Sequence, residues 1–157
     1  MSFLRFLMLL SLVVWLGGLI FFSFVVAPTL FSVLPTRHLA GSVVSRSLGA
    51  LHWMGLVSGV VFLISSMTHA RLAIGSAHPL AARHILLYIM LALTLISQFG
   101  ISPKMASLRA LGEIDSVPPT HPARVQFNAL HVWSTRLEGG VFLLGLIVVY
   151  LTAALPG

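Results

Sequence analysis

Residues 3–34 read FLRFLMLLSLVVWLGGLIFFSFVVAPTLFSVL, and no charged side chain follows Arg5 within this stretch. A membrane-spanning helix needs about 20 predominantly apolar residues, because each residue of an α-helix rises by about 1.5 Å. The stretch is therefore long enough to cross a bilayer as a helix. Pro28 lies inside it, and a proline removes one backbone hydrogen bond, so we expect a kink or the end of the regular helix there.

Three further stretches have the same character, and they cover residues 48–70, 83–101 and 123–155. The wholly apolar part of the last one, 139–155, is barely long enough alone, so we extend it back to residue 123. The sequence therefore predicts an all-α protein, an up-down bundle of four transmembrane helices that forms a single domain over residues 1–157. Pro103 is expected to stop the third helix. In the connection 102–122, residues 103–111 suit either a short helix on the membrane surface or a solvated linker.

The composition of the whole chain agrees with a membrane location. Hydrophobic residues make up 58 % of the chain and charged residues 8 %, against roughly 25 % charged residues in soluble domains. So few charges cannot cover a soluble fold, and the net charge of +6 is spread between the apolar stretches. We therefore do not expect a cytosolic enzyme or a nucleic-acid-binding protein. Cysteine is absent, which excludes disulfides, thiolate metal ligands and cysteine nucleophiles.

The basic residues indicate how the helices cross the membrane, since Lys and Arg concentrate in cytoplasmic loops. Six lie around the connections after the first and third spans, namely Arg37, Arg46, Lys104, Arg109, Arg124 and Arg136. Three lie on the other side, namely Arg5, Arg71 and Arg83. We therefore expect loop 102–122 in the cytoplasm and both termini outside it, in a protein of the bacterial inner membrane.

The fourth span carries one polar stripe, because its polar residues follow each other in steps of three or four. They are Arg124, Asn128, His131, Thr135 and Glu138, with Ser134 beside them. Glu138 is the only carboxylate in any predicted span, and ionisable side chains inside a bilayer usually face the protein interior. His131 shares the face of Glu138, whereas Arg136 points away from it, so His131 is the better partner for the carboxylate.

Polar residues that lie at the same membrane depth on antiparallel spans predict two polar clusters. The cluster near the cytoplasmic end consists of His52, Gln98, His131, Ser134 and Glu138. The cluster near the outer end consists of His69, His84 and Tyr88. The depth match follows from the topology, but contact between the residues does not, because the order of the helices is open. The remaining histidines are expected to be solvated in loops, and they are His38, His78 and His121.

Three interpretations of the cytoplasmic-end cluster compete. His52 and His131, if they face each other, could ligate haem iron, or bind copper or zinc with Glu138 as a third ligand. A chain of His, Glu and Gln side chains could instead relay protons or bind a polar solute. In the third interpretation these side chains only hydrogen-bond the helices together, which is the favoured interpretation for the outer-end cluster. The sequence has no phosphate loop, no Ser-His-Asp arrangement and no His-Glu-x-x-His motif, so an enzyme is not favoured.

Several motifs along nearly the whole chain resemble one known family. They are Trp15-Leu16-Gly17-Gly18-Leu19-Ile20-Phe21-Phe22 and Ala27-Pro28-Thr29-Leu30-Phe31 in the first helix, His52 at the start of the second, Pro103-Lys104-Met105-x-x-Leu108-Arg109 after the third, and Phe127-x-x-Leu130-His131-x-x-Ser134 in the fourth. Together they resemble the transmembrane-protein-205-like family, which implies a four-helix membrane domain. Members of that family tend to have Asn where this chain has Glu138, so the carboxylate either adds charge to the site or is a local peculiarity of this chain.

That family is similar in turn to copper resistance protein D and to the membrane protoporphyrinogen oxidase that carries haem b. Their first helix begins with a Lys-x-x-His pattern, at positions that are Arg5 and Met8 here. The resemblance therefore implies that the first-helix haem ligand is missing, with Met8 as the remaining candidate for an axial ligand.

Together these observations predict a non-enzymatic integral membrane protein that binds or helps export a small solute or a metal at the cytoplasmic-end cluster. The alternatives are a haem- or metal-binding redox protein, with haem b or a divalent metal as its cofactor, and a structural subunit of a larger membrane complex. Four helices enclose little space for a solute pathway within a single chain. We therefore expect a homo-oligomer or a partner within the membrane, in contact with lipid and not with nucleic acid.

Overall fold

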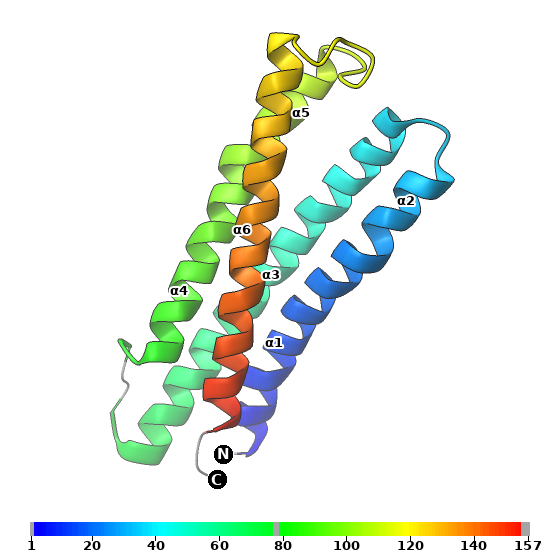
Figure 1. Cartoon of the computed structure of the whole chain (residues 1–157). Helices are drawn as coiled ribbons and strands as arrows, with labels where there is room; N and C mark the ends of the chain where they lie inside the picture. Colours follow the sequence, from blue (N-terminus) through cyan, green and yellow to red (C-terminus); the bar gives the residue numbers. More distant parts are fainter. Residues whose placement is uncertain (1, 77–78, 155–157) are drawn as a thin grey trace.

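The computed structural model describes residues 2–76 and 79–154, which are helical apart from short connections and include no β-strand. The helices form four long rods, and Figure 1 shows these rods packed side by side. The first rod combines α1 (Ser2–Phe21), the π-helix η1 (Phe22–Val26) and α2 (Ala27–Val33), and the second is α3 (Arg37–Ile74). The third combines α4 (Ala82–Leu95), the π-helix η2 (Ile96–Ile101) and α5 (Ser102–Ala110), and the fourth is α6 (Pro122–Ala153). All four rods are long and apolar enough to cross a membrane, so the predicted all-α, four-helix membrane bundle is confirmed.

The chain reverses at residues suited to helix ends. Thr36 is extended, and its hydroxyl oxygen accepts a hydrogen bond from the backbone N–H of Leu39, which caps α3. Gly75 ends α3 in the left-handed conformation (φ 72°), which glycine adopts at the least cost. Pro122 stands at the start of α6, where its missing N–H leaves no helical hydrogen bond unmade.

The helices run further than the predicted spans. α3 begins at Arg37 and not near residue 48, so the first connection is short and Arg46 lies on the helix. The third rod continues through Pro103 to Ala110, so the prediction that Pro103 stops this helix is wrong. Residues 103–110 extend the rod and form neither a separate surface helix nor a solvated linker. The predicted end of the fourth span, residue 155, lies outside the described residues.

Two prolines explain the two π-helical turns. Proline has no N–H, and its ring clashes with the carbonyl group one turn before it. In the first rod a wider turn closes with a hydrogen bond from Ala27 N–H to the Phe22 carbonyl oxygen, directly before Pro28. In the third rod Ser102 N–H bonds the Ser97 carbonyl oxygen directly before Pro103. Each rod therefore passes its proline without ending, and such single π-turns are frequent at functional sites.

The core forms between two helix pairs, α1 with α3 and α4 with α6. Its buried side chains include Trp15, Leu16 and Phe62. A glycine on α3 allows α1 and α4 to pack closely against it. A Cβ atom built on Gly59 would lie 3.1 Å from Cζ3 of Trp15 and 2.6 Å from Cδ2 of Leu91. Figure 1 shows the two pairs diverging toward the end that carries α2 and α5.

The contact between Gly55 and the indole of Trp15 gives a stability prediction. A Cβ atom on Gly55 would overlap this buried ring, so we expect Gly55→Val to lower the free energy of unfolding by about 1–3 kcal/mol through overpacking. Gly17 lies in open space: among the described residues, no atom outside its own helical turn lies within 4 Å of a built Cβ. Gly17→Val is therefore the matched control. Reversible unfolding in mixed detergent micelles measures both variants, and equal losses would contradict the packing of α1 on α3.

Candidate functional site

Three helices bring a histidine, a glutamine and a glutamate together inside the bundle. His52 on α3 is 2 % exposed. Its Nδ1 lies 2.8 Å from Gln98 Oε1 on η2, and its Nε2 lies 2.7 Å from Glu138 Oε1 on α6. We call His52, Gln98 and Glu138 the His52 trio. The trio links α3 to both rods of the other helix pair.

Ser97 adds a fourth side chain that was not among the predicted site residues. It is fully buried, and its hydroxyl donates to Glu138 Oε1 over 3.2 Å. Its place beside Gln98 in the turn before Pro103 is the signal that could have revealed it. In that turn Ser97 bonds Glu138 of α6, and the next residue, Gln98, bonds His52 of α3.

With Oε1 of Gln98 facing the ring, the hydrogen-bond partners set the number of protons in the trio. An amide oxygen only accepts hydrogen bonds, so the ring of His52 donates from Nδ1 to Gln98. A second proton lies between Nε2 and Glu138 Oε1, because a hydrogen bond of 2.7 Å needs one donor. The pair is therefore either imidazolium with carboxylate or neutral imidazole with carboxylic acid. Its net charge is zero in both forms, which lowers the cost of an acidic residue at membrane depth.

The two oxygens of Glu138 have different surroundings. Oε1 receives the contacts from His52 and Ser97, whereas no hydrogen bond from a described residue reaches Oε2. The side chain is 16 % exposed, and it lines a cavity. Glu138 is therefore held in place through one oxygen while the other is available to a bound molecule.

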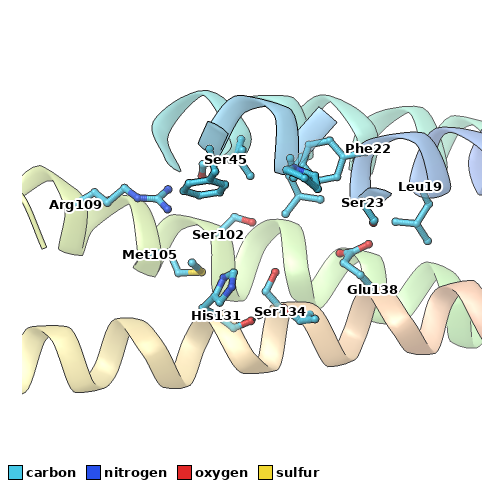
Figure 2. Close-up of a pocket in the computed structure, with 16 residues that line it drawn as sticks. Leu19, Phe22, Ser23, Ser45, Ser102, Met105, Arg109, His131, Ser134 and Glu138 are labelled. Carbon is cyan, nitrogen blue, oxygen red and sulfur yellow. Dashed lines mark hydrogen bonds between the residues drawn. The ribbon is translucent and has the colours of Figure 1, made fainter. Parts of the chain in front are cut away.

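The cavity has a volume of about 380 Å³ and lies between the first two rods and the α5–α6 side of the bundle. Figure 2 shows Arg109 at one end and Glu138 near the other, with His131 and Ser134 on α6 between them. The apolar part of the wall consists of Leu19, Phe22, Ala27, Pro28, Phe31, Val44, Leu48 and Met105. The remaining polar lining consists of Ser23, Ser45, Ser102 and Thr135.

Arg109 on α5 supplies a positive charge at the far end of this cavity. Its guanidinium carbon lies 4.9 Å from the centre of the Phe127 ring, within the range of a cation–π contact. No carboxylate in the described part of the chain forms an ion pair with it. This cavity, which we call the main cavity, therefore has a carboxylate at one end and a guanidinium at the other.

The structure divides the predicted cytoplasmic-end cluster into two groups. His52, Gln98 and Glu138 are in direct contact. His131 and Ser134 line the cavity, and no side-chain hydrogen bond joins them to the trio among the described residues. Glu138 thus bonds His52 across the bundle and not His131 on its own helix.

The predicted outer-end cluster is only partly assembled. His84 Nε2 lies 2.7 Å from Ser66 Oγ, and both side chains are fully buried. The Nε of Arg83 donates to the same hydroxyl over 3.0 Å. Within residues 2–76 and 79–154, no hydrogen bond joins His69 or Tyr88 to His84. Ser66 therefore takes the place that His69 was expected to fill.

The donor groups do not fit the haem or metal interpretations. No group of three or more His, Asp or Glu side chains in the described residues is arranged to hold a metal ion. Both ring nitrogens of His52 are engaged in hydrogen bonds, so neither is free to ligate iron opposite His131. Met8 is fully buried in the apolar core.

Of the three histidines predicted to lie in loops, one lies on a helix, one caps a helix, and one lies outside the described residues. His38 lies in the first turn of α3, where its Nδ1 is buried without a hydrogen-bond partner among the described residues. His121 caps α6, and its Nδ1 accepts from the backbone N–H of Ala123. His78 lies outside the described residues.

Comparison with known proteins gives a family. A search of curated proteins and one of solved structures each gave no match. Residues 10–113 match the sequence profile of a domain of unknown function, DUF4149, a match that names neither the transmembrane-protein-205-like family nor copper resistance protein D. The matched part holds His52, Ser97 and Gln98, whereas Glu138 and His131 lie beyond it. Since the match covers more than half of the chain, this membrane-type protein belongs to the DUF4149 family.

Proposed function

We propose that this membrane protein binds a small organic solute in the main cavity, with the carboxylate of Glu138 as its polar anchor. The observation that carries the proposal is the unequal use of the two carboxylate oxygens. Oε1 is held by His52 and Ser97, and Oε2 has no partner among the described residues. A donor group on a solute would complete this half-used carboxylate, and the other solute atoms would contact the apolar wall.

The shape and lining of the cavity support binding of a small molecule. Ligand pockets are typically about 300–1,000 Å³ and mostly apolar, with a few polar groups that set orientation. The cavity of about 380 Å³ has this character. Its two charged ends, Glu138 and Arg109, would distinguish solutes by charge and by the position of their donors.

The supporting contacts of Glu138 favour binding as well. A side chain fixed by neighbouring hydrogen bonds loses little further freedom when a ligand binds, so less of the interaction energy is lost to ordering. The resemblance to the transmembrane-protein-205-like family adds to this argument. An Asn at position 138 could also accept a hydrogen bond from His52, but it could not take up or release a proton. The carboxyl group of Glu138 therefore makes solute binding in this chain depend on charge.

The basic residues near the wide end of the bundle support a topology for this protein. Arg37, Lys104, Arg109 and Arg124 all lie toward the α2–α3 and α5–α6 connections. By the concentration of basic residues in cytoplasmic loops, we propose that the main cavity opens toward the cytoplasmic side of a bacterial inner membrane.

A set of three aromatic probes tests the proposed binding. The chain has no cysteine, so Ser102→Cys introduces a single thiol in the cavity wall, which can carry a trifluoroethyl group for ¹⁹F NMR in lipid nanodiscs. We expect a saturable shift with at least one of benzyltrimethylammonium, benzyl alcohol and phenylacetate. The shift should be lost in the Glu138→Leu background, because that change removes the anchor.

The matched control places the same label on the outward face of the same helix. Ser107 is exposed on α5, and among the described residues its hydroxyl bonds only the Lys104 carbonyl oxygen of that helix. A label on Ser107→Cys should therefore report no saturable shift. If none of the three probes moves the Ser102→Cys signal, the proposed function is overturned.

A further inference from the structure

A second, smaller cavity opens beside the main one, where α1 and η1 face α6. It has a volume of about 230 Å³, and its wall includes Ile20, Phe24, Gly139 and Phe142. Ile20 is 42 % exposed and Phe24 is 74 % exposed, so this wall lies on the surface that faces lipid in a membrane-spanning bundle. We call it the side cavity. The residues that line both cavities are Leu19, Ser23, Thr135 and Glu138.

The charge of the side cavity differs from that of the main cavity. Among the described residues that line the side cavity, Glu138 is the only ionisable one. Arg109 and His131 line the main cavity alone. Phe24 and Phe142 add aromatic rings, whose faces attract cations. A carboxylate near aromatic rings at lipid depth favours a molecule that is positively charged and otherwise apolar.

We propose that the side cavity is a lateral portal through which a hydrophobic organic cation reaches Glu138 from the bilayer. This inference rests on the proposed function, and it adds the chemical class of the solute and its route. The cationic group would contact Oε2 of Glu138, and its apolar groups would contact Phe24 and Phe142. An anion is disfavoured on this route, because it would meet the carboxylate before it reached Arg109.

Binding of the cation exchanges it for a proton. Before binding, the pair holds two protons, one on Nδ1 of His52 and one between Nε2 and Glu138 Oε1, and its net charge is zero. When the cation contacts Oε2, one proton leaves through the main cavity, and the carboxylate then balances the cation. The neutral ring of His52 keeps its remaining proton on Nε2 toward Glu138, and the amide of Gln98 turns over to donate to Nδ1. The site is neutral before and after, which avoids an unbalanced charge at membrane depth.

The groups around Glu138 are consistent with this exchange. His52 from α3 and Ser97 from η2 bond its Oε1. Two other titratable groups, His131 on α6 and Arg109 at the far end on α5, line the main cavity and not the portal. The proton and the cation therefore have separate routes, one toward the main cavity and one toward lipid.

Gly139 offers a way to close the portal without disturbing the site. Among the described residues, a Cβ atom here meets no atom within 4 Å outside its own helical turn, so a leucine at this lining position is expected to narrow the opening. Gly17 on α1 has equally open surroundings but lines neither cavity, which makes it the matched control. Ile20→Trp narrows the same opening from α1 and serves as a second variant if Gly139→Leu does not fold.

The binding experiment compares benzyltrimethylammonium with its uncharged carbon isostere, neopentylbenzene, using the ¹⁹F label on Ser102→Cys in nanodiscs. We expect the cation to bind at least about tenfold more tightly than the isostere. Glu138→Gln should remove that preference. An indicator dye should report about one proton released for each cation bound, as the charge balance requires. Equal affinity for the two probes, or no proton release, would overturn the proposal.

The portal is tested by the rate of association, obtained from ¹⁹F line shapes. Gly139→Leu or Ile20→Trp should slow association of benzyltrimethylammonium by about tenfold or more, and Gly17→Leu should leave it unchanged. An unchanged rate in folded portal variants would overturn the lateral route. If benzyl alcohol or phenylacetate binds while the cation does not, the proposed function stands and this inference falls. If no probe binds, both fall.

Discussion

Replacing His52 by leucine is expected to lower the free energy of unfolding by about 3–5 kcal/mol, the range for removing one member of a buried acid–base pair. His52 is 2 % exposed and bonds Gln98 and Glu138 through its two ring nitrogens. Leucine fills a similar volume but leaves the carboxylate with only the hydroxyl of Ser97. The loss therefore arises mainly from the uncompensated acid and not from an empty space.

A double-mutant cycle separates that cause from a packing defect. The double variant His52→Leu with Glu138→Leu removes both polar groups, so it should be more stable than His52→Leu alone. Reversible unfolding in mixed detergent micelles gives the free energy of each variant. Strictly additive losses would show that the contact of 2.7 Å between Nε2 and Oε1 does not contribute to stability.

His131 provides the matched control for this measurement. It is exposed on the cavity wall and has no side-chain hydrogen bond among the described residues, so His131→Ala should change the free energy of unfolding by no more than about 0.5 kcal/mol. A loss as large as that of His52→Leu would contradict the division of the predicted cluster into a bonded trio and a cavity wall.

The polar stripe and the depth match explain why much of the trio could be predicted from sequence. Glu138 is the single acid in the apolar stretches, and His52 and Gln98 lie at matching depths in antiparallel helices. These patterns do not fix the rotation of each helix about its own axis. That rotation makes His52 the partner of Glu138 and directs His131 into the cavity. A pattern on one helix therefore identified the acid but not its partner.

The prolines show why the extent of the helices could not be predicted. Pro103 was expected to stop the third helix, because proline cannot donate the usual backbone hydrogen bond. The structure instead widens the preceding turn, with Ser102 N–H bonded to the Ser97 carbonyl oxygen. This local solution also places Ser97 and Gln98 in the site. There Ser97 bonds Glu138 of α6 and Gln98 bonds His52 of α3, and a local sequence rule does not include such contacts between helices.

His84→Ala is expected to give the second large loss, about 2–4 kcal/mol in the free energy of unfolding. His84 is fully buried, and its Nε2 lies 2.7 Å from Ser66 Oγ, which also accepts from Arg83 Nε over 3.0 Å. A serine hydroxyl has one proton, so Ser66 can accept from Arg83 and donate to His84 at the same time. The alanine leaves this proton without its acceptor and opens a space between α3 and α4.

The matched variant is His69→Ala, at the other histidine of the predicted outer-end cluster. His69 is only partly buried and forms no hydrogen bond with His84 among the described residues, so its loss should be below about 0.5 kcal/mol. Ser66→Ala should lie between the two, at about 1–3 kcal/mol, because it removes the hydroxyl that bonds Nε2 of His84 without creating a large space. The order His84, Ser66, His69 distinguishes a buried hydrogen-bond chain from histidines that merely lie near the membrane surface. If His69→Ala cost as much as His84→Ala, depth in the membrane and not the contact with Ser66 would be the source of stability.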